Sequence, residues 1–229
     1  MAQLKRVVIF AGSVAAALTM LTSARAEMTS WPGDFLTRLE ALALVQTLNA
    51  EILASRSATL SLEKWCGEHR LGGAGETKIV ARLMRGDAKP AIAEQRQRLQ
   101  VGPHEELKYR RVQLLCGDRV LSQADNWYVP SRLTPDMNRL LETTDTPFGK
   151  AVVDLKPNRQ TFAAKVLWWP LAQGWEMKPL PAGDQGEALM IPDALFEHQA
   201  VLFTNNRVPF SEVHEVYQRQ LLDFPLPHP

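Results

Sequence analysis

Apolar side chains recur at helical spacing in the first part of the chain. Between Trp31 and about Ser55 they come every three or four residues, which predicts a long helix with one buried face. A second, shorter helix is expected to begin after Ser57 and to extend to about Trp65. The apolar residues of the first helix are Leu36, Leu39, Leu42, Leu44, Val45, Leu48, Ile52 and Leu53.

The pattern changes to that of paired strands at Tyr109. Two apolar-rich runs, Tyr109–Cys116 and Arg119–Val129, are joined at Gly117-Asp118, two residues that tolerate the positive φ of a tight connection. This pattern predicts a β-hairpin. Two adjacent arginines, Arg110 and Arg111, stand near the start of the first strand. Because strand side chains alternate between faces, one of the two must point away from the strand's other apolar side chains.

The rest of the chain adds further strands and short helices. Pro130 ends the hairpin, and Thr134 with Pro135 starts a helix that extends to about Thr143. Residues 88–102 are polar, and we leave them open between a continued strand and an exposed excursion. The remaining expected elements are strands at 77–85, 160–169, 200–204 and 208–222, a short helix or turn at 150–155, a loop at 172–190 and a helical turn at 192–197. The sum predicts an α+β fold with about five or six antiparallel strands in one sheet.

The first 26 residues have the pattern of a secretory signal peptide. Lys5 and Arg6 precede an apolar run from Val7 to about Thr22, and Ala24-Arg25-Ala26 is a small-x-small cleavage pattern. A retained membrane anchor is the alternative, but the run is short for a span of roughly 20 residues. We therefore expect cleavage after Ala26, export to the periplasm without a stable membrane anchor, and one domain over residues 27–229.

Composition excludes some classes of function and leaves one question open. The formal net charge is +1, so the chain lacks the basic excess of a nucleic-acid-binding protein. Two cysteines and five histidines show no spacing typical of a metal site, and no metal is expected. Cys66 and Cys116 could form a disulfide in an exported protein, or could be buried as two small apolar residues. We expect a monomer.

Candidate chemistry comes from the last strand. Glu212 shares its expected face with Phe210 and Val216, and a carboxylate among apolar neighbours is costly to bury unless it is paired. Arg111, on a face with Leu115, has the right charge for a partner. A structural ion pair and a solvent-exposed sheet face are the alternatives to a functional site. Ser211 and His214 do not suggest a nucleophilic set with Glu212, because neighbouring strand residues point to opposite faces.

The order of several short motifs resembles the chorismate lyase family. That family has an arginine heading an RxxLLC strand, a hairpin return that ends in proline, a helix, and a TPLG turn. The chain also has a Ser57-Ala58-Thr59 segment where the family starts a lid helix. The matching residues here are Arg111-Val112-Gln113-Leu114-Leu115-Cys116, Tyr128-Val129-Pro130, Thr146-Pro147-Phe148-Gly149 and Phe210-Ser211-Glu212-Val213.

This resemblance implies a fold, an activity and a set of site residues. The family has an antiparallel sheet with helices on one side and an enclosed ligand pocket, and it eliminates pyruvate from chorismate to give 4-hydroxybenzoate without a cofactor. By resemblance, Arg111 would bind the ring carboxylate and Glu212 would face the 4-oxygen. Backbone groups at Ala58 and Phe148 would complete the substrate site. The chain departs from the family at Asn126, where an arginine is common, at Phe148, where leucine is usual, and in its export signal.

Two functions follow from the resemblance. In the first, the protein is a carbon-oxygen lyase in which Arg111 and Glu212 are catalytic. In the second, it is an exported binding protein for small aromatic carboxylates on the same fold, without turnover. A secreted structural protein with no ligand pocket is a third possibility.

Overall fold

The computed structural model describes residues 30–73, 75–179 and 187–226. The expected signal peptide, residues 1–26, lies outside these ranges. The helices and strands, in chain order, are α1 (Phe35–Ala54), α2 (Ala58–Glu68), β1 (Ile79–Leu83), α3 (Ala93–Arg98), β2 (Lys108–Cys116), β3 (Arg119–Tyr128), α4 (Pro135–Thr143), α5 (Phe148–Ala151), β4 (Asn158–Val166), β5 (Ala194–Phe203) and β6 (Pro209–Gln218).

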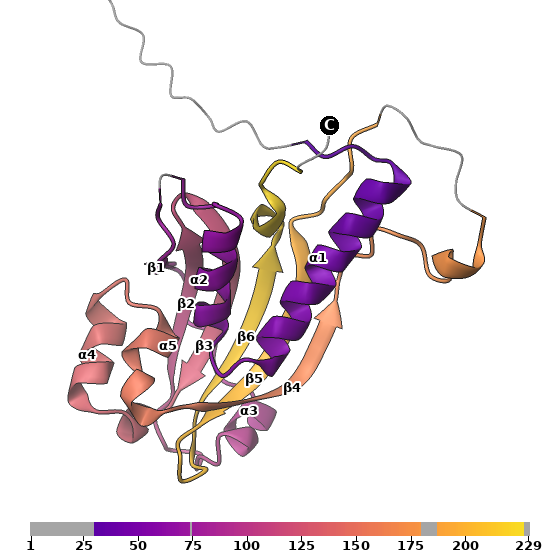
Figure 1. The fold of residues 1–229 in the computed structure, drawn as a ribbon. Helices are drawn as coiled ribbons and strands as arrows, with labels where there is room; N and C mark the ends of the chain where they lie inside the picture. Colours follow the sequence, from indigo (N-terminus) through magenta and orange to yellow (C-terminus); the bar gives the residue numbers. More distant parts are fainter. Residues whose placement is uncertain (1–29, 74, 180–186, 227–229) are drawn as a thin grey trace, which may run out of the picture.

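The strands form one sheet in which every neighbouring pair is antiparallel. Their order is β1-β2-β3-β6-β5-β4, so β2 and β3 pair as the expected hairpin and β6 lies in the middle. Figure 1 shows α1 and α2 lying across one face of this sheet. The expected α+β fold with a single antiparallel sheet is confirmed.

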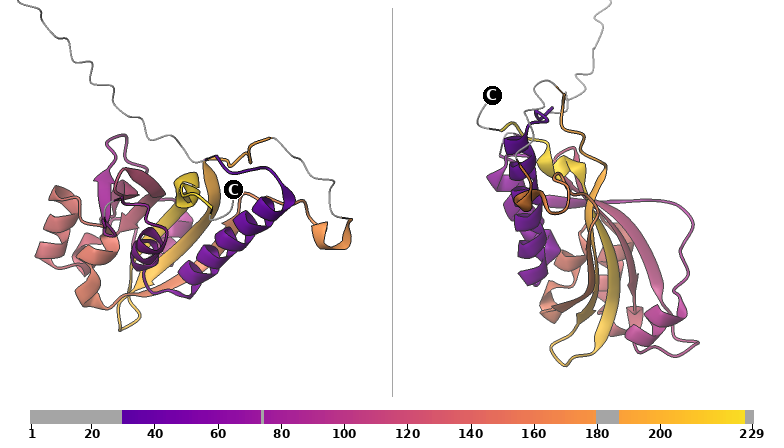
Figure 2. Two further views of the ribbon diagram at one scale, coloured as in Figure 1. Left: turned by 45° about the horizontal axis from the view of Figure 1, so that its top comes forward. Right: turned by 90° about the vertical axis from the view of Figure 1, so that its right-hand side faces the viewer.

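The longer helices α1 and α2 lie on one face of the sheet, and the short helix α3 is an addition on the other face. Figure 2 shows α1 and α2 on one side and α3 on the other. Helix α3 comes from the polar stretch 88–102, which the sequence left open between a strand and an exposed excursion. The helix sits there because Leu99, at its end, packs on a small apolar cluster with Trp127, Val129 and Val201.

The helix starts at Asp34 and Thr134 carry side-chain caps, and the predicted start at Thr134 is confirmed. Asp34 Oδ1 accepts a hydrogen bond from the Thr37 amide at 2.9 Å at the start of α1. At the start of α4, Thr134 Oγ1 accepts from the Met137 amide at 3.2 Å, and Pro135 occupies the first turn. These local signals depend on neighbouring residues alone, which explains why the sequence was sufficient to find them.

The expected helical turn at 192–197 is wrong. Residues from Ala194 onward are the first half of β5, which pairs with β6 on one side and β4 on the other. A register shift between Ala194 and Phe196 lets the adjacent Leu195 and Phe196 both enter the core. This bulge removes the two-residue alternation by which a strand is recognised in sequence.

A disulfide settles the question left open by the two cysteines. Cys66 of α2 is bonded to Cys116 at the end of β2, with the two Cα atoms 6.1 Å apart. The bond ties the C-terminal part of α2 to the sheet. The opposite end of α2, at Ser57, borders a pocket.

Candidate functional site

A pocket lies between the sheet and the N-terminal ends of α2 and α5. Its volume is about 60 Å³, and strands β2, β3, β6, β5 and β4 contribute to its floor. Ala58 and Phe148, two of the site residues that the resemblance implies, line it. The polar side chains that line it are Arg56, Ser57, Thr59, Arg110, Asn126, Arg159 and Glu215.

Arg110 presents unsatisfied donors to this pocket. It is only 4% exposed, and its Nη2 donates to the carbonyl oxygens of Thr144 and Thr146 at 3.3 and 3.1 Å. Its Nε and Nη1 are buried and have no hydrogen-bond partner among the described residues. Burial lowers the pKa of the Arg110 guanidinium, which still remains charged at neutral pH because of its high starting value. A buried cation with two free donors calls for an anion.

A second buried arginine reaches the pocket from β4. Arg159 Nη1 lies 2.7 Å from Glu215 Oε2 of β6, while its Nε and Nη2 are buried without a partner in the described part of the chain. Burial opposes the charge of Arg159, but the Glu215 carboxylate outweighs it and the pKa of Arg159 is raised. The pocket therefore contains two buried guanidinium groups and one carboxylate.

Glu215 is held by a second donor, Tyr217. The Tyr217 hydroxyl donates to Glu215 Oε2 at 3.1 Å, so both bonds to this carboxylate fall on the same oxygen. Burial, and then the charge of Glu215, raise the pKa of Tyr217 well above its usual value. Neither of these two bonds uses Oε1 of Glu215.

The start of α2 adds backbone donors to the same pocket. Ser57 Oγ caps the helix by accepting from the Leu60 amide at 3.4 Å. The amides of Ala58 and Thr59 lie in the first turn, where an α-helix has no internal partner for its N–H groups. An anion near Arg110 would also lie at the partly positive end of α2.

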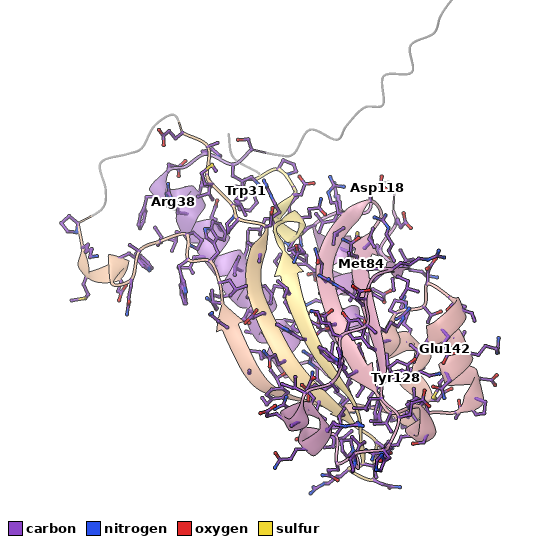
Figure 3. The ribbon with its side chains drawn as sticks, turned by 180° about the vertical axis from the view of Figure 1, so that it is seen from behind. Trp31, Arg38, Met84, Asp118, Tyr128 and Glu142 are labelled. Carbon is purple, nitrogen blue, oxygen red and sulfur yellow. A yellow bond between two sulfur atoms is a disulfide. The ribbon has the colours of Figure 1, made fainter. Side chains whose placement is uncertain are left out.

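Arg111 and Glu212, the two site residues expected from the motifs, do not meet in the pocket. Arg111 has a 43% exposed side chain on the other face of the sheet, with its Nε 3.5 Å from Asp125 Oδ1. Figure 3 shows this face, where Met84, labelled there, donates its amide to the Arg111 carbonyl at 2.9 Å. The motif placed the arginine one residue too late, since Arg110, and not Arg111, shares the inward face of β2.

Glu212 is buried beneath α3, on the face away from the pocket. Its two oxygens accept from Arg98 Nε and Nη2, both at 2.8 Å. It pairs in register with Trp127 of β3 and Val201 of β5. The structural ion pair, one of the alternatives left open above, is what the structure contains here, with Arg98 as the partner in place of Arg111.

A bulge explains why the sequence put Glu212 on the wrong face. β5 pairs Leu202 with Ser211 and Phe203 with Pro209, so Phe210 has no register partner on β5 and turns toward the main core. Glu212 therefore does not share a face with Phe210, although the two are two residues apart. The inward residues of β6 are Ser211, Val213, Glu215 and Tyr217. Arg110 and Glu215 each have an apolar residue two positions further along the strand. This spacing could have identified both as residues of the inward face.

Ser211 belongs to the pocket side but carries no nucleophilic set. Its Oγ donates to Asn126 Oδ1 at 2.8 Å, and it is fully buried. His214 lies on the opposite face and its Nε2 is 3.4 Å from Glu197 Oε2.

Across residues 30–73, 75–179 and 187–226, no group of three or more His, Cys, Asp or Glu side chains could hold a metal ion. No helix in these ranges has the length and apolar character needed to cross a bilayer.

One comparison with known proteins decides the family. The uncharacterized protein y4mC of Sinorhizobium fredii (strain NBRC 101917 / NGR234) is 52% identical over 198 residues, which cover 86% of this chain and 83% of that protein. This chain belongs to the y4mC family. No family model matches the chain.

The y4mC-family chain also overlaps in part with solved regulator structures. The ligand-binding domain of a proposed GntR-family transcriptional regulator from Bordetella bronchiseptica matches with a TM-score of 0.40 at 16% identity, covering 62% of this chain and 83% of that one. PhnF from Mycobacterium smegmatis matches with a TM-score of 0.41 at 9% identity, covering 66% and 63%. Likeness at this level carries no functional argument.

Proposed function

We propose that the protein binds a small organic carboxylate in the pocket between α2, α5 and the sheet. The observation that carries this proposal is the pair of buried arginines, Arg110 and Arg159, which present four unpartnered nitrogen donors to one cavity. Leaving such donors buried without acceptors costs about 1–3 kcal/mol for each group. An anionic ligand supplies the missing acceptors and balances the surplus positive charge.

In this proposal, each end of the ligand contacts a different set of protein groups. The carboxylate would lie against Arg110, whose planar fork suits a two-oxygen acceptor, and against the first-turn amides of α2. The other end would face Arg159 and Glu215, where donors and an acceptor stand side by side. This division of roles is that of the sequence-based hypothesis, but with Arg110 and Glu215 in place of Arg111 and Glu212.

The binding experiment compares two adjacent arginines that lie on opposite faces of the sheet. Wild-type protein is titrated calorimetrically with a panel of short and aromatic carboxylates. Arg110→Gln is expected to weaken carboxylate binding at least tenfold, because it removes the buried charge. Arg111→Gln is the matched control and should bind within twofold of wild type, since its side chain lies on the other face. Equal losses in both variants would exclude the pocket as the binding site.

Pyruvate elimination from chorismate is a second candidate function. The resemblance to chorismate lyases supports it, and so does the position of Ala58 and Phe148 in the pocket lining. Glu215 would then polarise the ether oxygen, aromatisation of the ring would supply the driving force, and the protein would mainly orient the substrate. Against it, Glu215 accepts from both Arg159 and Tyr217, an arrangement that suits a carboxylate better than a proton donor.

A coupled assay for pyruvate separates the two candidates. The lyase requires pyruvate release from chorismate that disappears in both Arg110→Gln and Glu215→Gln. Binding without turnover predicts heat on titration with carboxylates and no pyruvate above the level of the Arg110→Gln variant. We expect the second result.

A further inference from the structure

We infer that the ligand is a short hydroxy acid of two to four carbons, and that Phe148 excludes six-membered rings. This inference rests on the proposed carboxylate site and specifies its ligand. It is carried by the size of the cavity, by the packing of its aromatic wall, and by the polar groups at its two ends.

The cavity is too small for a ring. Its volume is about 60 Å³. A buried apolar cavity that binds benzene has a volume of about 150 Å³. The present cavity offers about two fifths of that space, which suits a molecule with a few heavy atoms.

The aromatic wall cannot retreat without disturbing the core. Phe148 is 9% exposed, and its ring stacks on Phe210, with centroids 6.3 Å apart and planes at 16°. Its other aromatic neighbour is Tyr128, at 5.7 Å between centroids. Phe210 is fully buried, so a shift of Phe148 toward it would require repacking of the main core.

The backbone behind Phe148 is equally confined. A Cβ on the next residue, Gly149, would lie 3.3 Å from Ser57 Oγ and 3.4 Å from Thr59 Oγ1. Helix α5 thus packs closely on the start of α2, against the Ser57 and Thr59 side chains. The ring wall is fixed from both sides, and the size limit is a property of the packed structure.

The polar groups define the second functional group of the ligand. Arg159 offers two unpartnered donors and Glu215 a carboxylate, and both residues line the same small cavity as Arg110. A hydroxyl group can accept from Arg159 and donate to Glu215 at once. One negative charge on the ligand balances two guanidinium groups and one carboxylate. A short acid with one carboxylate and one hydroxyl meets both requirements.

Calorimetric titration of the purified protein tests the ligand class. Glycolate and lactate are expected to bind at least tenfold more tightly than acetate, which lacks the hydroxyl, and 4-hydroxybenzoate should give no measurable binding. In Glu215→Gln, the preference for glycolate over acetate should fall to within about threefold, with acetate affinity little changed. Chloride or phosphate binding as tight as that of glycolate would overturn the inference.

Variants at Phe148 test the size limit. Phe148→Ala should bind 4-hydroxybenzoate measurably, which wild type should not, and Phe148→Leu, a smaller change that preserves more of the packing, should bind it more weakly than Phe148→Ala. Val153→Ala, an exposed neighbour, is the control and should behave as wild type. Binding of 4-hydroxybenzoate to wild type as tightly as glycolate would refute the inference and leave the carboxylate site standing. No binding of any carboxylate would refute the carboxylate site, and this inference with it.

Discussion

Two arginines that are adjacent in the sequence have opposite surroundings in the fold. Arg110 is buried against the pocket, and Arg111 is exposed beside Asp125 on the other face. The same separation applies to Glu215 and Glu212, which are three residues apart on β6. An error of one residue in matching the motif therefore selects Arg111, which lies beside Asp125, in place of Arg110, which lines the pocket.

The Arg98–Glu212 pair predicts a large effect on stability and none on binding. Arg98→Met leaves the Glu212 carboxylate buried without a partner and should lower the free energy of unfolding by about 3 kcal/mol, toward the lower end for buried pairs because Arg98 is partly exposed. Urea denaturation measures the change. Arg98→Met combined with Glu212→Met should recover most of the loss. Carboxylate binding in the pocket should remain within twofold of wild type, and a larger change would contradict the structural role.

Burial of His198 should make the free energy of unfolding fall at acid pH. It is fully buried, and its Nε2 lies 2.8 Å from Asn49 Oδ1. Burial, and then the charge of Arg159, lower the pKa of His198 to about 4. The unfolded chain binds this proton near pH 6.5, so the stabilisation is complete above pH 6.5 and is lost as the pH falls toward 4. The loss should be about 3 kcal/mol.

Urea denaturation at pH 7.5, 5.5 and 4.5 measures this dependence. His198→Gln removes the titrating group, so its unfolding free energy should fall less between pH 7.5 and 4.5 than that of wild type. His104→Gln, at an exposed position, is the control and should follow wild type. Parallel curves for all three proteins would show that His198 does not cause the acid sensitivity.

At the scale of whole elements, α2 is bonded to the sheet at one end and borders the pocket at the other. The disulfide from Cys66 holds its C-terminal part on β2, while Ser57, Ala58 and Thr59 at its start border the pocket. The same strand, β2, carries Arg110. The covalent link therefore joins the two elements that would hold the ligand carboxylate.

Removal of the disulfide should destabilise the fold strongly. The bond spans 50 residues of sequence, for which the loop-entropy relation gives about 4 kcal/mol. Cys66→Ala combined with Cys116→Ala should lower the free energy of unfolding by roughly this amount in urea denaturation. Wild type treated with dithiothreitol should match the double variant. A reductant effect of the same size on the double variant would mean that the disulfide is not responsible.

At the scale of the whole molecule, we propose that the protein is exported. The apolar run from Val7 to Thr22 and the Ala24-Arg25-Ala26 pattern support a cleaved signal peptide. The Cys66–Cys116 disulfide supports an oxidising compartment, because such bonds rarely persist in a reducing cytosol. Both features are independent of the pocket.

Expression of the full chain in a bacterium tests export. Mature protein recovered from the periplasm should begin at Glu27 and contain no free thiol, as measured by mass spectrometry with and without alkylation. The control is the double variant Ala24→Asp, Ala26→Asp, which leaves Arg25 unchanged. These changes should block cleavage and give a longer product. Recovery of wild type in the cytoplasm with its first 26 residues intact would contradict the proposal.

The sequence by itself determined the elements whose signals are local. Capping at Asp34 and Thr134 and the tight turn at Gly117-Asp118 act over a few residues, and so they fixed α1, α4 and the β2–β3 hairpin. The alternation of β2 even required that Arg110 and Arg111 point to opposite faces. The resemblance to the chorismate lyase family pointed to Ala58 and Phe148, which line the pocket.

Only the tertiary structure decided which charges meet. The bulge at Phe210 depends on how β6 pairs with β5, and it shifts the faces of the strand in a way that no two-residue alternation records. The stretch 88–102 formed a helix over Glu212 because an apolar cluster from distant strands offered it a surface. Long-range pairing and packing set these features, since their energies come from contacts between residues far apart along the chain.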